Sequence, residues 1–378
     1  MIKGLKFAFA FFSIYCISTF SFAGQLSLGA VFDGWTTNFV NPVNGTEFWV
    51  PYSVSFNLDP GINVYGLGEF GVGSYTPSND GPETTNLSDF SDTLVGTELR
   101  FKSFDLPSLL SVGFNIPTGD KTWEGKELNS IVPIEFVDPT YTGQGFGISA
   151  MYGLSFKDGT GEFGAAAGYS YAGSYDPGSL PGVPSGELKL GDAVYLAFNH
   201  VQPFSGNQSE TIRLSAFYFL QTQVSGQPVY QLGPNLNASY LWLNPKGLSY
   251  EAGIQYYLKA ERPNASGTLA TEADQYLAPR FYLNPSYAFG DFVLGVQLKY
   301  VLPNGYSTSD PSGLYDGGGL LAGIGPSYRL KLDGTSDLKL FGSYEYIIHH
   351  NGGQDANLNL VDADYNLFTI GATYELRL

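Results

Sequence analysis

Cysteine and histidine are almost absent from this sequence, which removes most of the chemistry of metal sites and covalent catalysis. The 378 residues include one cysteine, Cys16, and three histidines, His200, His349 and His350. Cys16 lies in an N-terminal apolar run, so the rest of the chain can form no disulfide and no thiolate site. Neighbours in a strand point to opposite faces, so His349 and His350 are not placed to bind one metal ion. We expect no metal, no cofactor and no enzyme activity.

Charge and long apolar runs are also scarce. Charged residues make up 14% of the chain, against about 25% in soluble globular proteins. Beyond the N-terminal segment, no run approaches the roughly 18 apolar residues of a membrane-spanning helix. Aromatic residues reach 16%, glycine contributes 48 residues, and the mean hydropathy is near zero. This combination is typical of a transmembrane β-barrel, although composition alone also allows a secreted β-sandwich.

The N-terminus predicts export. Lys3 and Lys6 precede the uncharged, mostly apolar run 7–20, and Ser21-Phe22-Ala23 then has the small-x-small pattern of a cleavage site. We therefore expect a signal peptide at 1–23 and a barrel at 24–378. The formal charge of −17 becomes −19 when the two lysines of the leader are removed. Such an acidic chain is not expected to bind nucleic acid.

Apolar and polar residues alternate with period two along much of the chain, which predicts strands with two different faces. In the last segment, Phe368, Ile370 and Ala372 alternate with Thr369 and Gly371. The segment 213–219 is apolar on both faces, which makes its assignment as a wall strand weaker.

Turn residues divide these segments in a regular way. Short links rich in Gly, Pro, Asp and Asn are predicted at 59–61, 105–107, 158–161, 205–207, 244–247, 290–291 and 333–335. Longer polar connections lie between them at 34–46, 75–93, 118–145, 175–187, 224–231, 260–275, 304–317 and 351–365. Alternating short and long links predict an all-β fold, a closed antiparallel transmembrane β-barrel of about 16 strands with short periplasmic turns and long external loops.

The longest connection, 118–145, is the third long one in this scheme. In general porins the third loop folds into the lumen, and this connection resembles it in position and length. Its acidic residues are candidates for a pore constriction that would favour cations or neutral solutes. They are Asp120, Glu124, Glu127, Glu135 and Asp138. A loop standing outside the barrel is the alternative.

Basic residues concentrate on faces that should line the lumen, mostly near the short links. The candidates are Arg100, Lys102, Lys299, Arg329 and Lys339. They could set a transverse field across a pore. They could equally form structural ion pairs, such as Glu98 with Arg100 or Glu345 with Lys339.

Aromatic residues fall near predicted strand ends and suggest interfacial girdles facing lipid. They include Trp35, Phe48, Trp49, Trp242, Tyr306 and Tyr365.

The C-terminus resembles the signal that outer-membrane barrels present for assembly. Thr369, Gly371, Tyr374 and Leu376 have its polar, glycine, aromatic and hydrophobic spacing, although Arg377 and Leu378 follow where that signal usually ends on an aromatic residue. The expected partners are therefore outer-membrane lipid and lipopolysaccharide, the barrel assembly machinery and small solutes. An oligomer is compatible with the sequence.

Two short passages, covering about a tenth of the chain, resemble the outer-membrane family named after the meta-pathway of phenol degradation. They are the strand-ending segment 110–120, with Pro117-Thr118-Gly119-Asp120, and the segment Tyr141-Thr142-Gly143-Gln144-Gly145. The resemblance implies a barrel for uptake of small, often aromatic or hydrophobic compounds. The long-chain fatty-acid transporters are a rival family, but their N-terminal plug has no counterpart here.

Two functions of different class remain open. The first is an outer-membrane channel for passive or weakly selective passage of small solutes. The second is a structural barrel that forms a sleeve or scaffold for a partner protein, such as a periplasmic cytochrome in an electron conduit. A sleeve needs a wide lumen, whereas a selective channel needs a constriction.

Overall fold

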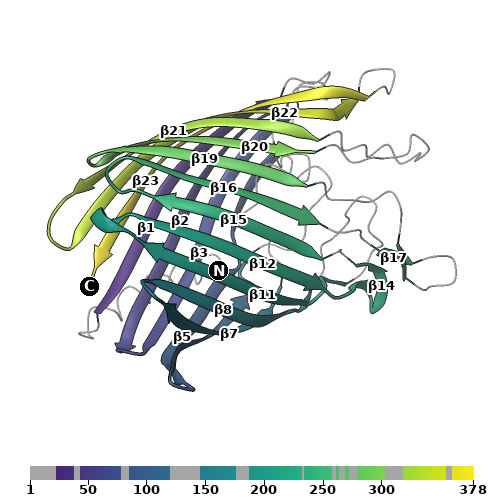
Figure 1. Ribbon diagram of the computed structural model, residues 1–378. Helices are drawn as coiled ribbons and strands as arrows, with labels where there is room; N and C mark the ends of the chain where they lie inside the picture. The colour runs from purple at the N-terminus through teal and green to yellow at the C-terminus, as the bar shows by residue number, and fades with distance from the viewer. Residues whose placement is uncertain are drawn as a thin grey trace, which may run out of the picture.

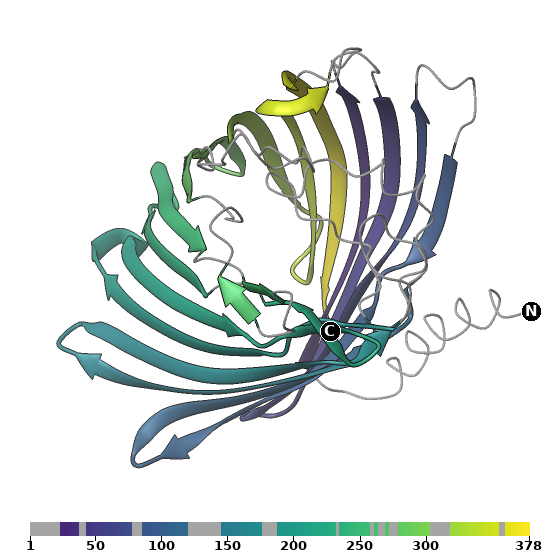
Figure 2. The same cartoon turned by 90° about the vertical axis from the view of Figure 1, so that its right-hand side faces the viewer.

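A computed structural model shows one antiparallel barrel (Figure 1). It describes residues 23–37, 43–77, 85–119, 145–175, 187–231, 234–257, 261–263, 269–271, 279–302, 318–354 and 360–378. Its strands are arranged in a ring when the barrel is viewed from one end (Figure 2). Within these residues, no helix is long and apolar enough to cross a membrane.

The wall follows the chain from strand to strand, each pairing antiparallel with the next. Its segments are β1 (Ala23–Thr37), β2 (Val43–Asp59), β3 (Ile62–Pro77), β4 (Thr85–Phe90), β5 (Thr93–Ser103), β6 (Leu106–Ile116), β7 (Gly147–Asp158), β8 (Gly161–Ala172), β11 (Ala193–Pro203), β12 (Ser209–Phe219), β15 (Asn235–Leu243), β16 (Leu248–Tyr257), β19 (Arg280–Phe289), β20 (Phe292–Val301), β21 (Gly319–Lys331), β22 (Ser336–Gln354) and β23 (Leu360–Arg377). Both β4 and β5 pair with β3, so these 17 segments make 16 strands. The predicted closed barrel of about 16 strands is confirmed.

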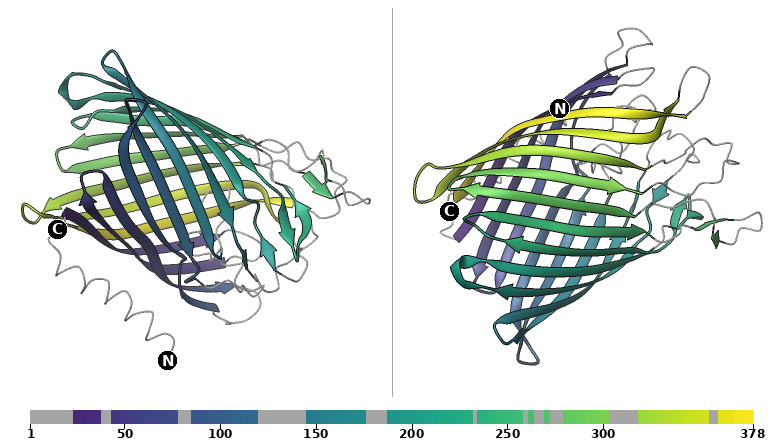
Figure 3. Two further views of the ribbon diagram at one scale, coloured as in Figure 1. Left: turned by 90° about the horizontal axis from the view of Figure 1, so that it is seen from below. Right: turned by 45° about the horizontal axis from the view of Figure 1, so that its top comes forward.

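The first and last strands close the ring. β1 pairs with β23 from Gln25 opposite Arg377 to Thr37 opposite Tyr365. At the end of this seam, Leu378 N donates to Gly24 O at 2.8 Å, and Gly24 N donates to Leu378 O at 3.2 Å. The C-terminus therefore lies at the end with the short hairpin turns (Figure 3). This end is called the turn end below, and the opposite end is the loop end.

The registers separate two faces along every strand. On β20, Gln297 and Lys299 share the inner face with Gly323 and Leu321 of β21, whereas Val296 lies on the outer face. The outer face carries exposed apolar side chains, for example Ile370 at 63% and Tyr344 at 49%. An apolar belt that is exposed around a closed barrel is the surface that hydrocarbon covers.

The seven predicted short links all join neighbouring wall strands. One prediction is displaced, because the link expected at 105–107 turns at Phe104 and Asp105, while Leu106 already belongs to β6. Phe104 and Asp105 both have positive φ, 53° and 62°. Two such residues in succession are the geometry of a tight hairpin turn, and this geometry is not evident from a Phe-Asp pair.

At the loop end, strands extend further than predicted. The connection expected at 351–365 is mostly strand, since β22 runs to Gln354 and β23 begins at Leu360. Short strands lie within or directly beside three other expected connections. These are β9 (Ser174–Tyr175), β10 (Leu188–Lys189), β13 (Thr222–Val224) and β14 (Gln227–Tyr230) in one small sheet, and β17 (Glu261–Pro263) with β18 (Leu269–Thr271) in another.

The expected aromatic girdle is wrong for three of its residues. Trp35 and Tyr365 are 5% and 7% exposed, and both lie on the inner face. Trp49 also points inward, where its Nε1 donates to Asp33 Oδ2. Phe48 does lie on the outer face and is exposed. Trp242 also lies on the outer face, where it is half-buried beside Phe204. Tyr306 lies outside the described residues.

We predict that the two faces of β20 differ sharply in their tolerance of charge. Val296→Arg places a cation in the hydrocarbon belt and should destabilise the barrel by about 2–4 kcal/mol if it lies near the midplane. Gln297→Arg is the matched control, because it adds the same side chain to the inner face. Urea unfolding in phospholipid vesicles measures both. Equal destabilisation would contradict the register.

Candidate functional site

The inner wall of the barrel is the candidate functional surface, and a group of aromatic rings lies on it at β11 and β12. The ring of Tyr195 stacks on Phe217 at 5.7 Å between centroids and 27° between planes, and Phe217 stacks on Phe219 at 6.4 Å and 15°. Tyr195 pairs with Gly168 and with Phe217 across the inner face. We call these three side chains the aromatic ledge. They explain why the segment 213–219 is apolar on both faces.

A glycine lets the ledge lie flat against the wall. A Cβ on Gly168 would meet the ring of Tyr195 at 2.1 Å, so any larger residue there would push the ring into the lumen. An aromatic ring packed over a glycine in this way lies close to the wall.

Polar amides continue the inner wall beside the ledge. Asn235 lies opposite Phe217, and Asn237 lies opposite Ser215. Asn237 Nδ2 donates to Ser215 Oγ at 3.2 Å. The Oδ1 atoms of Asn235 and Asn237 are buried and have no hydrogen-bond partner among the described residues. The wall thus holds two buried amide oxygens, without a partner in the described part of the chain, next to the stacked aromatic rings.

Carboxylates gather on the inner face near the seam. Asp33 lies directly opposite Glu47 on the neighbouring strand. Its two oxygens accept hydrogen bonds from Trp49 Nε1 and Thr369 Oγ1. Glu345 is electrostatically coupled to Asp33 and to the cation of Lys299. Like charges directly opposite each other destabilise a sheet, so these donors and this cation offset part of that repulsion.

The structure places the five basic candidates on the inner face, as two pairs and one separate residue. Arg100 and Lys102 lie on β5 near its turn, and Arg329 and Lys339 lie opposite each other on β21 and β22 near theirs. Lys299 lies towards the loop end of β20. The structure therefore does not bring the five together.

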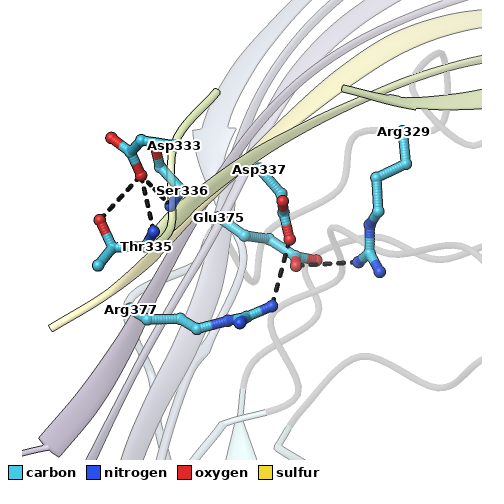
Figure 4. A network of polar contacts seen from close by, with 7 residues as sticks. All are labelled: Arg329, Asp333, Thr335, Ser336, Asp337, Glu375 and Arg377. Atoms are coloured by element: carbon cyan, nitrogen blue, oxygen red, sulfur yellow. Dashed lines mark hydrogen bonds and ion pairs between the residues drawn. The ribbon is translucent and has the colours of Figure 1, made fainter. Parts of the chain in front are cut away.

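Three arginines near the turns have carboxylate partners. Arg329 pairs with Glu375 at 3.2 Å and Arg377 with Asp337 at 3.3 Å, both beneath the turn at Asp333 (Figure 4). The suggested pair of Arg100 with Glu98 is present at 3.6 Å.

The suggested pair of Glu345 with Lys339 is wrong. Six residues of one strand separate the two by about 20 Å. Lys339 instead lies 5.9 Å from the ring centroid of Phe341.

The five constriction candidates, Asp120 to Asp138, lie outside the described residues, but the roots of their connection do not. Asp92 sits in the break between β4 and β5 and accepts hydrogen bonds from Asn115 Nδ2 at 2.6 Å and Gly119 N at 3.1 Å. Asn115 Nδ2 also donates to Gly145 O at 2.7 Å. One root is thus bonded to the Asp92 carboxylate, and the other is bonded to Asn115, which Asp92 also holds. No local sequence pattern distinguishes Asp92, because the break is visible only in the pairing with β3.

The four residues of the assembly pattern lie on β23. Thr369 and Gly371 face inward, and Tyr374 and Leu376 face outward. Gly371 is required by packing, since a Cβ there would meet the ring of Phe341 at 2.3 Å. Among the described residues, no group of three or more His, Cys, Asp or Glu side chains is placed to hold a metal ion.

Solved structures share this architecture. The outer membrane protein OpdK of Pseudomonas aeruginosa is 8% identical, with a TM-score of 0.51, and the alignment covers 94% of this chain and 99% of OpdK. The chain has the fold of an outer-membrane channel. OpdL of the same organism is 12% identical, with a TM-score of 0.50, and the alignment covers 95% of this chain and 99% of OpdL. At such identities the similarity establishes the fold alone.

The closed barrel and its apolar outer belt place the chain in the outer membrane. No known family profile and no curated protein matches the chain. The resemblance to the phenol meta-pathway family therefore stays a hypothesis.

The carboxylate of Asp333 makes the stability of its turn depend on pH. Asp333 Oδ1 accepts hydrogen bonds from the backbone N–H groups of Thr335 and Ser336, both at 2.7 Å. These bonds lower the pKa of Asp333 from 3.8 to about 2. A lowered folded-state pKa means that the stabilisation is complete above the pKa of the unfolded chain and is lost as pH falls towards about 2.

We therefore expect Asp333→Ala to be less stable than wild type near neutral pH, and the gap to close as the pH falls from about 4 to 2. Asp291→Ala, in another turn, is the control. Unfolding curves at several pH values measure the gap, and a gap that does not change with pH would contradict this role of the carboxylate.

Proposed function

We propose that the protein is an outer-membrane channel through which small solutes diffuse. The observation that carries the proposal is the closed barrel whose outer face is apolar and whose inner wall combines the aromatic ledge with polar and charged side chains. A wall of this kind suits water and solutes, because polar groups that face a wet lumen keep their hydrogen bonds.

We further propose that the channel favours solutes with an aromatic or apolar part. The ledge offers ring faces on the inner wall, and stacking on a ring gains about 0.5–1.5 kcal/mol beyond area burial. Asn235 and Asn237 lie beside it, so a polar part of the wall adjoins the rings. The resemblance to the phenol meta-pathway family points to the same class of solute.

The acidic residues of 118–145 are proposed as the constriction. Asp92 and Asn115 tie both roots of this connection to the wall at one place. Carboxylates held in a narrow section would disfavour anions.

A sleeve for a partner protein would use the same barrel. Conductance separates the two functions, because a pure sleeve without its partner should show a wide pore with no preference between solutes.

The first test uses planar bilayers. The wild type should show discrete conductance steps, and benzyl alcohol should reduce the current in a saturable way. Phe217→Ala removes the middle ring of the ledge and should weaken this effect about fivefold. Phe341→Ala removes an inner-face ring remote from the ledge and should leave the effect unchanged. Absence of any conductance would contradict the channel, and equal effects of the two variants would contradict the role of the ledge.

The second test concerns charge. Neutralising Glu124, Glu127, Glu135 and Asp138 to Gln or Asn should shift the reversal potential under a salt gradient towards anions. The control neutralises Asp80, Glu83, Asp310 and Asp316, which belong to other connections and change the net charge equally. Salt screens exposed charges within about 8 Å at physiological strength, so the control should shift the potential much less. Equal shifts would place the constriction elsewhere.

A further inference from the structure

A groove of about 740 Å³ follows the inner wall. One row of paired residues on its floor crosses seven neighbouring wall strands, from β1 to β8. The row begins with Ser27 and Ser53, continues with Leu67 and Leu94, and passes through Asn115 to the last two strands. Its volume lies within the range of small-molecule sites, about 300–1,000 Å³. We call it the hydroxyl groove.

The groove has an apolar centre with hydroxyl groups on either side. Leu67 is 43% exposed on the inner face and lies beside Leu94. Ser27 and Ser53 lie to one side of the leucines, and Ser149 and Ser170 to the other. These four hydroxyls make no hydrogen bond with other parts of the described chain, so they are available to a solute.

Two carboxylates border the groove on its loop-end side. Glu69 and Asp92 both line it, and carboxylate oxygens accept hydrogen bonds from hydroxyl groups. A pyranose ring has the complementary arrangement, since its C–H face is apolar and its hydroxyls project from the rim. The groove therefore fits a neutral, hydroxylated ring better than a bare hydrocarbon.

The groove also borders the aromatic ledge. Ser170 pairs with Ala193, and Ala193 pairs with Phe219, all on the inner face. Two strand spacings, about 10 Å, thus separate the last hydroxyl of the groove from the first ring of the ledge. One small molecule with a sugar ring and an aromatic ring spans that distance.

From this juxtaposition we propose that the hydroxyl groove is a binding site for the sugar part of aryl glycosides, whose aromatic part rests on the ledge. The proposal builds on the channel function and names the solute class of its lumen. Binding in the groove is reversible and occupies only one part of the inner wall, so the solute remains able to pass.

Single-channel recordings with three probes test the proposal. Phenyl β-glucoside contacts both surfaces, glucose only the groove and benzyl alcohol only the ledge. The wild type should bind phenyl β-glucoside more tightly than either of the others. The double variant Ser53→Ala, Ser170→Ala removes two hydroxyls from the groove. It should weaken the binding of phenyl β-glucoside and glucose about tenfold and leave that of benzyl alcohol unchanged.

The matched control is Ser286→Ala, Ser343→Ala, which removes two inner-face hydroxyls outside the groove and should change none of the three affinities. If phenyl β-glucoside binds no more tightly than glucose, or if the groove variant and the control behave alike, the site assignment is wrong. Normal open-channel conductance in that case leaves the channel function standing. A wild type without conductance would contradict the channel function itself.

Discussion

The hydrogen-bonded seam between β1 and β23 is the constraint on which the rest of the structure depends. A sheet of sixteen strands that stayed open would expose two rows of unpaired N–H and C=O groups, and hydrocarbon offers these groups no partner. The seam pairs the strands along 13 positions, from Gln25 with Arg377 to Thr37 with Tyr365. Asp33 reinforces it from the inside by accepting hydrogen bonds from Trp49 and Thr369 on the two flanking strands.

Closure turns the period-two alternation of each strand into an inside and an outside. Because side chains alternate without exception along a regular strand, one register shift would move every apolar residue of that strand into the lumen. The inner face is then free to carry function, provided that its large side chains do not fill the space. Two rings lie close to the wall because the residue beneath each is glycine, Gly168 beneath Tyr195 and Gly371 beneath Phe341. The aromatic ledge and the hydroxyl groove are both products of this arrangement.

The parts of this structure that depend on local sequence could be predicted, and those that depend on pairing could not. Turn residues such as Asp59-Pro60-Gly61 locate the hairpins, and alternation around Gly371 assigns the two faces of β23. β22 and β23 extend further towards the loop end than the sequence predicts, because the polar residues in 351–365 indicate a loop although each strand still has a partner.

Predictions about residues of the lumen fail for the same reason. Trp35 is expected to face lipid because it lies near a strand end. The alternation of side chains along β1 instead places it on the inner face. The break that holds Asp92 and the approach of Ser170 to Phe219 arise between strands far apart in sequence. No local pattern encodes such proximity.

In this structure a closed wall separates lipid from a water-filled lumen. Cysteine scanning of β20 is the most direct test of this separation. The chain after the predicted leader contains no cysteine, so single cysteines can be introduced without background. A charged, water-soluble thiol reagent should modify cysteines at Gly295, Gln297 and Lys299 on the inner face and spare those at Leu294, Val296 and Leu298 on the outer face. Uniform labelling, or labelling of the outer-face positions alone, would contradict the account.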